Sequence, residues 1–416
     1  MLQQHDTIII GGGQAGLAAS YYLTQQNRDH AILEKKRIGE TWRSGKWDSF
    51  TLVTPNHMLQ LPGFAYEGED SDGFLTRDEV VKYLEDYVDK FDPLIRTGVE
   101  VSRVREVDIE NKFLLETNIG EFVADNLIVA TGTFQFPDTP EFASKLPSHI
   151  KQLHSSEYKN PDTLPEGAVL VVGSAQSGCQ IADELNENGR EVFLCTGSAN
   201  RLPRRYRGHD SFWWAEQLGI MDQTPDDLPS PKARFMPNPQ VSGKNGGKTL
   251  GLHQLAQDGV QLLGRLKDIN GTNLSLGEDL MDNLAQADKF AVEFKQGVDQ
   301  YIEKTDMQVP ESQRPVSRAG YEVDIITRLD LEDEGITSVI WATGYNYDYS
   351  WIDFPVFDDV GYPVTERGVT EQPGLYFVGL HFLDKRKSGL LLGVGDDAAH
   401  VTEHIATHTK ELVSES

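Results

Sequence analysis

The sequence predicts an α/β fold with two interleaved Rossmann-like dinucleotide-binding domains and a mainly helical insertion in the second. Three observations support this fold class. An apolar strand, a glycine loop and a helix follow one another in IIIGGGQAG at residues 8–16, and the same order returns in VLVVGSAQSG at residues 169–178. The third is length: 416 residues can form two or three domains, and a hydrophobic content of 38% is typical of a globular chain.

The first unit is expected to begin with a βαβ arrangement. Short apolar runs at residues 6–10 and 30–34 flank the glycine loop and its helix. Thr76 and Glu79 form a capping box, which predicts that a helix begins there. The segment 99–128 is β-rich with a hairpin turn at Asn118–Gly120, and it leads into a buried strand at 126–130.

The second unit interrupts the first. Its expected strands, at residues 168–172 and 191–195, flank a glycine loop and a helix that runs to Leu185. From about 208 to 314 the pattern changes to loops and two amphipathic helices, at 252–266 and 279–304, with a turn at Asn270-Gly271. Strands at 336–342 and 374–378 then return to the first unit. We therefore expect residues 1–160 and 330–416 to form one domain and 161–329 the other.

Composition excludes several classes of protein. The formal charge of −27 disfavours nucleic-acid binding. No apolar run reaches the ~18 residues of a membrane span, and a strand beginning near Asp6 leaves no room for a signal peptide. Cys179 and Cys195 form no CxxC pair, and the 11 histidines show no metal-ligand spacing. A cytoplasmic protein without a metal, a membrane partner or a dithiol centre is expected.

The first glycine loop is expected to hold a dinucleotide. Gly11 permits the tight turn, Gly13 lets a pyrophosphate approach the backbone, and Gly16 lets helix and strand pack closely. Glu34 follows Gly16 by 34 − 16 = 18 residues, where a carboxylate can accept a hydrogen bond from a ribose hydroxyl. The alternative is a tight strand-to-helix turn without a ligand.

The second glycine loop differs from the first at the position that is expected to contact the ribose. The same offset from Gly178 reaches Thr196 instead of an acid, and Arg201, Arg204 and Arg205 follow. Loss of the carboxylate with nearby guanidinium groups favours a ribose 2′-phosphate, as in NADPH. The alternative for the arginines is a solvated basic turn.

Two short turns accompany the loops. Residues 130–132 read Ala-Thr-Gly, and residues 342–345 read Ala-Thr-Gly-Tyr, each after an apolar strand. Glycine at such a strand end lets the chain cross close to a bound cofactor. The two copies strengthen the interpretation of two paired binding sites.

These motifs together resemble the class B flavin-dependent monooxygenases, in particular the short bacterial members of the flavin-containing monooxygenase type. The resemblance spans nearly the whole chain. It is carried by the residues 11–16, 39–43, 130–132, 154–158, 173–178, 342–345, 373–379 and 389–396.

The resemblance implies FAD on the first loop and NADPH on the second. The expected FAD-binding residues are Gly11, Gly13, Gln14, Ala15, Gly16, Glu34, Lys35, Gly39, Trp42, Arg43, Thr131, Gly132, Gly379 and Leu391. The expected NADPH-binding residues are Gly173, Ala175, Gln176, Ser177, Gly178, Thr196, Arg201, Arg204, Arg205, Thr343, Gly344 and Tyr345. It further implies that O2 forms a flavin C4a-hydroperoxide, which oxygenates a small molecule, with N- or S-oxygenation favoured.

The chain departs from the family pattern at the flavin. Val53 stands where many members carry an asparagine, and Thr54 or Asn56 are the candidates to replace it in catalysis. If neither does, an NADPH-dependent flavin reductase or oxidase without oxygen insertion is the alternative, followed by a flavin-binding sensor. His154 and the aromatic segment 212–214 could each have a structural or a functional role, and the sequence leaves both open. The substrate stays open, as does the oligomeric state, with a homodimer as one option.

Overall fold

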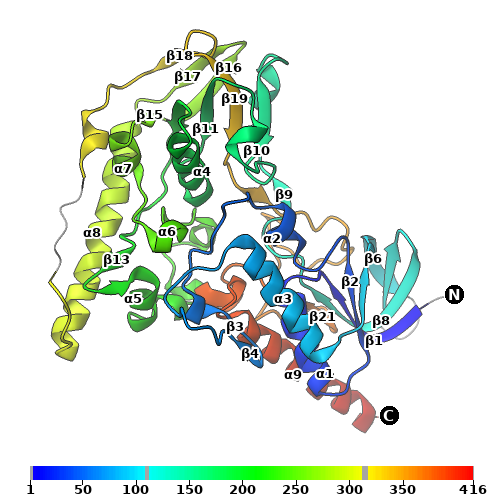
Figure 1. The fold of residues 1–416 in the computed structure, drawn as a ribbon. Helices are drawn as coiled ribbons and strands as arrows, with labels where there is room; N and C mark the ends of the chain where they lie inside the picture. Colours follow the sequence, from blue (N-terminus) through cyan, green and yellow to red (C-terminus); the bar gives the residue numbers. More distant parts are fainter. Residues whose placement is uncertain (1–2, 108–111, 312–316, 416) are drawn as a thin grey trace.

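The computed structural model describes residues 3–107, 112–311 and 317–415. It has two lobes, each built on a mainly parallel sheet (Figure 1). The lobe that holds both chain ends is blue, cyan and red in Figure 1, and the other lobe is green and yellow. Two Rossmann-type sheets in one chain confirm the predicted fold class.

The first sheet has the strand order β5-β2-β1-β8-β7-β6, and β21 pairs with β8. Its strands are β1 (Gln3–Ile10), β2 (His30–Glu34), β5 (Ile95–Thr97), β6 (Val101–Val107), β7 (Lys112–Thr117), β8 (Gly120–Val129) and β21 (Leu375–Phe377). β1 runs parallel to both β2 and β8, so its carboxyl end lies at the centre of one sheet edge. The predicted hairpin turn joins β7 to β8.

Helices cover this sheet and place the first glycine loop. They are α1 (Gln14–Gln25), α2 (Glu40–Ser44), α3 (Arg77–Phe91) and α9 (Val394–Glu415). α1 packs beside α9, which brings the end of the chain next to its beginning (Figure 1). The predicted capping box is present: Thr76 accepts from the Glu79 amide, and the Glu79 carboxylate accepts from the Thr76 amide.

The second sheet has the order β10-β19-β11-β12-β15, with all neighbours parallel. Its strands are β10 (Lys151–His154), β11 (Ala168–Val172), β12 (Val192–Cys195), β15 (Gln261–Leu263) and β19 (Ile336–Trp341), with α4 (Gln176–Glu187) after β11. β10 and β19 belong to this sheet, although the expected boundaries assigned both segments to the first unit. The chain returns to the first sheet through an isolated parallel bridge of Ile352 with Val104 of β6 and then through the strand β21.

The insertion is less helical than its pattern suggested. The expected helix at 252–266 stops after α7 (Leu252–Gln257), because Gly259 adopts a φ of +101°. The next residues form β15, and the Asn270-Gly271 turn closes a hairpin of β16 (Leu266–Asn270) and β17 (Asn273–Leu276). The second expected helix is present as α8 (Leu280–Thr305). The apolar residues of the segment 260–263 belong to a buried strand. In so short a segment, the spacing of apolar residues alone does not distinguish a strand from a helix.

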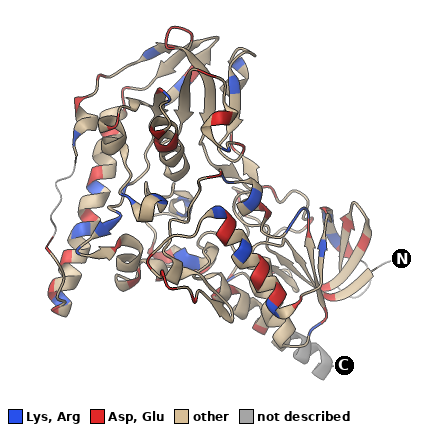
Figure 2. Cartoon of the chain, in the orientation of Figure 1, with Lys and Arg blue, Asp and Glu red and all other residues tan. Residues whose placement is uncertain are grey.

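The remaining elements are short. They are β3 (Gln60–Leu61), β4 (Phe64–Ala65), β9 (Phe136–Pro137), β13 (Arg205–Tyr206), β14 (His209–Asp210), β18 (Arg328–Asp330), β20 (Tyr345–Asn346), α5 (Ser211–Gln217) and α6 (Lys244–Gly247), with 3₁₀ turns at Asn56–Met58, Glu141–Lys145, Pro161–Thr163, Ile220–Asp222, Pro225–Asp227, Pro231–Phe235, Ala319–Glu322 and Arg386–Gly389. Acidic residues are spread along both lobes with basic residues among them (Figure 2). Within the described ranges, no helix is long and apolar enough to cross a bilayer.

Candidate functional site

The first glycine loop has space for a ligand at one position and none at the other two. Gly11 has a φ of +114°, and a Cβ there would lie 2.5 Å from the carbonyl oxygen of Ala130. A Cβ on Gly16 would lie 2.0 Å from the carbonyl oxygen of Gly11. A Cβ on Gly13 would meet no atom within 4 Å. The loop is therefore closed against strand and helix but open where a pyrophosphate would approach.

The second loop repeats the two closed positions of this geometry, and Ala175 stands where the first loop has Gly13. Gly173 has a φ of +105°, and its Cβ would lie 2.4 Å from the carbonyl oxygen of Ala342. A Cβ on Gly178 would lie 1.8 Å from the carbonyl oxygen of Gly173. Ala130 and Ala342, which begin the two Ala-Thr-Gly turns, thus occupy equivalent places beneath the two loops. The turns and the loops form one repeated unit, as their order in the sequence suggested.

Both loop helices begin without a side-chain cap. The N-cap residues are Gly13 for α1 and Ala175 for α4, and neither helix start receives a side-chain hydrogen bond. Thr76 caps α3 and Asp210 caps α5, whereas α2, α6, α7 and α8 also begin without a side-chain cap, so the missing cap counts only together with the glycine loop before it. The first backbone N–H groups of a helix have no partner within the helix, so an uncapped start presents donors and a partial positive charge to an anion. Two such starts fit two pyrophosphates.

The carboxylate of Glu34 lies at the first loop. It accepts hydrogen bonds from the Gly12 amide at 2.6 Å and from the Lys36 amide at 2.7 Å, which fix its orientation. Each carboxylate oxygen has a further lone pair, so the group can still accept from a ribose hydroxyl. The arrangement fits a ribose without a 2′-phosphate, because a phosphate would meet a like charge.

Replacing Glu34 with alanine should weaken flavin retention. Loss of a charged hydrogen bond to the ribose costs ~1.5–3 kcal/mol, about a ten- to hundredfold rise in the flavin dissociation constant. Flavin released by ultrafiltration measures the effect. Glu116→Ala is the matched control, because Glu116 pairs with Arg105 at a half-exposed site on β7. Equal flavin retention in both variants would contradict the assignment of Glu34.

The other expected FAD residues surround this loop. Gly39 ties α2 to the loop, since its amide donates to the carbonyl oxygen of Gly12 at 3.1 Å. Gln14 donates from Nε2 to the Gly389 carbonyl oxygen, and a Cβ on Gly379 would lie 2.4 Å from the Cβ of Ala15. The C-terminal segment therefore closes on the start of α1. Leu391 is buried in the same core.

Two expected FAD residues are engaged with other parts of the protein. The Nζ of Lys35 pairs with Glu100 at 2.6 Å, where both side chains are exposed. Arg43 donates from Nε to the Ile38 carbonyl oxygen and pairs with Glu85. Trp42 lies beside Phe50, with 6.0 Å between the ring centroids. Thr131 accepts a hydrogen bond from Gln135 Nε2, and Gly132 has a φ of +73°.

The arginines that were expected at the NADPH ribose do not act as one cluster. Arg204 is 1% exposed and forms a buried ion pair with Asp210, in which its Nε donates at 2.7 Å. Arg201 is buried as well and pairs with Asp288 of α8 at 2.7 Å. Arg205 is exposed and donates to the Gly247 carbonyl oxygen. The fold uses Arg201 and Arg204 to hold the insertion, because each finds a carboxylate there.

A different arginine lies beside the end of β12. Thr196 is buried and donates to the Leu263 carbonyl oxygen, so its hydroxyl faces the protein core. The next residue, Gly197, would place a Cβ 3.9 Å from Nη2 of Arg265, which follows β15 and is half exposed. Sequence reasoning missed Arg265, because only the pairing of β15 with β12 brings it to this edge.

Residues after the second Ala-Thr-Gly turn contact the linker between the sheets. The Nε2 of His154 donates to the Gly344 carbonyl oxygen at 3.0 Å, and its Nδ1 accepts from the Ser156 amide. Burial lowers the pKa of His154, which favours the neutral ring. Tyr345 packs edge-on against His154, and burial raises the pKa of Tyr345. These contacts favour the structural reading of His154.

The candidates near the flavin position have distinct surroundings. Asn56 is buried; its Nδ2 donates to the Asp70 carbonyl oxygen and its Oδ1 accepts from the Leu75 amide. Thr54 is partly exposed. The carbonyl oxygen of Val53 accepts from Nη1 of Arg204 at 2.8 Å, which joins this segment to the insertion. The Asn56 amide already has partners at both ends, so Thr54 is the freer of the two candidates.

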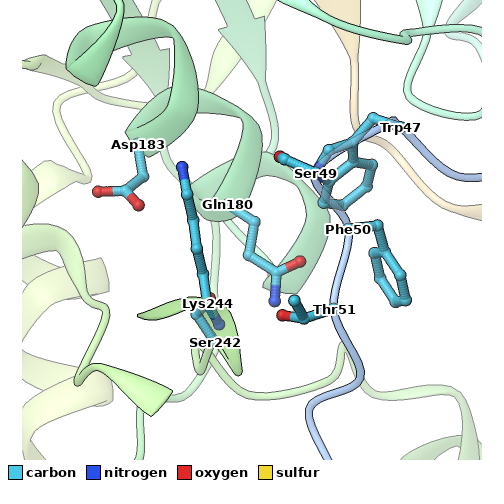
Figure 3. Close-up of a pocket in the computed structure, with 8 residues that line it drawn as sticks. All are labelled: Trp47, Ser49, Phe50, Thr51, Gln180, Asp183, Ser242 and Lys244. Carbon is cyan, nitrogen blue, oxygen red and sulfur yellow. The ribbon is translucent and has the colours of Figure 1, made fainter. Parts of the chain in front are cut away.

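A narrow crevice, with room for about one water molecule, lies between the segment 47–51 and α4. Figure 3 shows Gln180 of α4 reaching toward Thr51, with Trp47 and Phe50 on the opposite wall. Asp183, Ser242, Lys244 and Ser49 complete the lining. Burial raises the pKa of Asp183, although Lys248 opposes this effect. The crevice is bordered by both lobes and lies beyond the first turn of the second loop's helix.

The two cysteines and the aromatic segment have structural surroundings. Cys179 and Cys195 are buried free thiols, and burial raises the pKa of Cys195 to about 12. Trp214 is fully buried and donates from Nε1 to the Tyr206 carbonyl oxygen, in a cluster with Phe294 of α8. The segment 212–214 therefore anchors α5 to α8. Among the residues that the structure describes, no group of three or more potential ligands gathers to hold a metal.

Comparison with known proteins identifies relatives along the whole chain. The model of the pyridine nucleotide-disulphide oxidoreductase family matches residues 8–210. An uncharacterized CzcO-like oxidoreductase of Geobacillus kaustophilus is 37% identical over 406 residues, which cover 97% of this chain and 99% of that protein. A probable indole-3-pyruvate monooxygenase of Arabidopsis thaliana, YUCCA1, is 26% identical over 422 residues, covering 99% of this chain and 92% of that protein.

Solved structures show the same fold at lower identity. A flavin-containing monooxygenase from Stenotrophomonas maltophilia has a TM-score of 0.67 at 19% identity and covers 98% of this chain and 100% of its own. OTEMO in complex with FAD and NADP has a TM-score of 0.59 at 16% identity, covering 98% of this chain and 86% of its own.

Proposed function

The chain belongs to the class B flavin-dependent monooxygenase-like oxidoreductases, and we propose that it uses FAD, NADPH and O2 to oxygenate a small molecule at nitrogen or sulfur. The observation that carries this proposal is the repeated unit: two glycine loops closed in the same way against strand and helix, each leading into a helix without a side-chain cap, and two Ala-Thr-Gly turns beneath them. An enzyme that carries electrons from a nicotinamide to a flavin needs both nucleotides at once.

The residues of the chain then have distinct tasks. The α1 amides and Glu34 hold the FAD, whereas the α4 amides hold the NADPH phosphates. A bound flavin would supply the redox chemistry between the nicotinamide and O2, and the residues of the chain would position it. Trp47 and Phe50 form an apolar wall on one side of the crevice. The neutral His154 fixes the second crossing turn relative to the linker.

The test of the reaction is its stoichiometry. The flavin-loaded protein is supplied with NADPH and O2, and a panel of amines and thioethers is added one at a time. A monooxygenase consumes one NADPH per oxygenated product and releases little hydrogen peroxide in the presence of its substrate. Peroxide equal to NADPH with every compound would refute oxygen insertion.

The alternative, an NADPH-dependent flavin reductase or oxidase, has one specific observation in its favour. The side chain of Val53 is apolar, its carbonyl oxygen is held by Arg204, and the Asn56 amide is engaged on both sides. No strong amide donor at this segment is thereby left to protect an activated oxygen. Peroxide release in the stoichiometric test separates this function from the first.

The cofactor preference has its own test at Arg265. We propose that its guanidinium, beside Gly197 at the end of β12, contacts the 2′-phosphate of NADPH. Arg265→Ala is then expected to raise the KM for NADPH about tenfold or more, with the KM for NADH unchanged. Steady-state oxidation of both nucleotides measures this. Arg205→Ala is the comparison, and a larger NADPH-specific loss there would restore the original assignment.

A further inference from the structure

Lys46 is a buried lysine whose ammonium group has no polar partner. It is 8% exposed and lies between α2 and the segment that lines the crevice. Its Nζ forms no hydrogen bond or ion pair with any residue in the described part of the chain. The buried cations Arg204 and Arg201, by comparison, each hold a carboxylate. A largely buried charge without a protein partner is costly, even where its tip keeps some contact with solvent, so this exception calls for a function.

Three aromatic rings surround the ammonium group. The Nζ lies 4.4 Å from the ring centroid of Phe134, 5.3 Å from that of Phe50 and 5.9 Å from that of Trp42. Cation–π attraction compensates part of the lost hydration. An ammonium has three N–H donors, however, and ring faces do not replace the oxygen acceptors that it prefers. The cage holds the charge in place but leaves its donors free for a ligand.

The cage lies where the two crossing turns meet. Phe134 follows the first Ala-Thr-Gly turn, and its ring packs edge-on against Tyr345 of the second turn with 5.0 Å between centroids. Tyr345 in turn contacts His154. These turns lie beneath the two glycine loops, so Lys46 projects into the region that both dinucleotides would share.

The charged and titratable groups around Lys46 leave it without a counter-charge. Lys46 contributes to lowering the pKa of His154, which burial already keeps neutral. Tyr345 has a raised pKa and is neutral too. Lys159 donates from Nζ to the backbone carbonyl oxygen of Lys46 at 3.3 Å and adds positive charge. Burial lowers the pKa of Lys46 to about 8, with no carboxylate opposing the shift.

We propose that Lys46 is the oxyanion-binding residue of the cleft, where its ammonium receives a phosphate of the nicotinamide nucleotide or a carboxylate of the substrate. The proposal rests on the proposed function, because it places both ligands between the same two turns. The two sources share one chemistry, an anionic oxygen that accepts from the free N–H groups and neutralises the charge. In so acidic a chain, such a residue draws an anion to the reaction centre against the general field.

Binding measured by calorimetry tests this independently of turnover. The flavin-loaded full chain at pH 7 is titrated with NADP⁺, with inorganic pyrophosphate and with benzoate. Lys46→Gln is expected to weaken binding of the relevant anion tenfold or more, and Lys46→Arg to keep it within about threefold. Lys82→Gln is the matched control, since Lys82 is 71% exposed and pairs with Asp86 on α3. Its affinities should equal those of the wild type.

The probes distinguish the two sources. Weaker NADP⁺ and pyrophosphate binding with unchanged benzoate binding assigns Lys46 to the nucleotide, and the reverse pattern assigns it to a substrate carboxylate. Equal affinities for all three probes in the wild type and Lys46→Gln would overturn the proposal, as would a wild type that binds none of them. NADPH reduction of the flavin is measured separately, and its absence would refute the proposed function instead.

The pH profile supplies a readout that a structural role would not give. A lysine with a pKa of about 8 is charged below that pH, so the wild type should lose affinity as the pH rises above 8. A bound anion itself raises the pKa, which moves the loss upward. Lys46→Arg stays charged, so its affinity should be flat to pH 9. Identical profiles in the two proteins would contradict the proposal even if Lys46→Gln fails to fold.

Discussion

Gly178→Ala is expected to lower kcat/KM for NADPH by more than about a hundredfold while the protein keeps its flavin. The added Cβ would lie 1.8 Å from the Gly173 carbonyl oxygen and 3.3 Å from the Cβ of Ala342. Helix α4 must therefore move away from its strand, and its uncapped amides move with it. A displacement of about 1 Å at such a site suffices for a loss of this size.

Two further glycine variants sharpen this experiment. Gly16→Ala meets the same obstruction in the first loop, with 2.0 Å to the Gly11 carbonyl oxygen, and should release the flavin. Gly297→Ala is the matched control, because it lies within α8 with Leu218 Cδ1 at 4.0 Å, where alanine is the better helix former. Flavin absorbance and stopped-flow reduction by NADPH measure both sites. Loss of flavin from Gly178→Ala would show that the loops do not act separately.

Arg204→Ala is expected to destabilise the protein by about 3–5 kcal/mol, because it leaves Asp210 buried without its partner. The Arg204 guanidinium also donates to the Val53 carbonyl oxygen and lies over the Phe74 ring at 4.5 Å. It thus joins the insertion to the segment beside the flavin position. Urea unfolding followed by fluorescence measures the change in the free energy of unfolding.

Arg205→Ala is the control variant for the Arg204→Ala experiment. Arg205 is exposed and makes one bond to the Gly247 carbonyl oxygen, so its replacement should alter stability by less than ~0.5 kcal/mol. Asp210→Asn keeps an oxygen that can cap α5 but removes the charge, and it should fall between the two. Unchanged stability with a higher KM for NADPH in Arg204→Ala would instead return this residue to the nucleotide site.

The elements with local signals were predicted closely. β2 and β11 have the expected bounds, and the α3 capping box was readable from Thr76 and Glu79. Local sequence specifies such features because a cap or a glycine with positive φ depends on its immediate neighbours. The segment 252–266 was predicted less well. Its strand β15 forms only because β12 offers a partner far away in sequence.

The predicted binding residues show the same difference between local signals and contacts distant in sequence. The glycine loops and Glu34 lie where the motif places them, since the spacing along one βαβ unit fixes their geometry. The roles of the arginines depended on distant carboxylates: Asp288 on α8 takes Arg201, and Asp210 takes Arg204. A run of basic residues predicts charge but does not say which acid will neutralise it.

The sequence by itself determined that this chain carries two glycine loops of the dinucleotide-binding type, one followed at the same offset by Glu34 and the other by Thr196, because glycine spacing and one carboxylate are local properties. The tertiary structure decided which partner each cation has. It buries Arg204 against Asp210, brings Arg265 beside Gly197 while pairing it with Asp279, and leaves Lys46 among three rings with no acid from the described residues. The physical reason is that the pairing of a charge depends on which side chains the fold brings within a few ångströms of it.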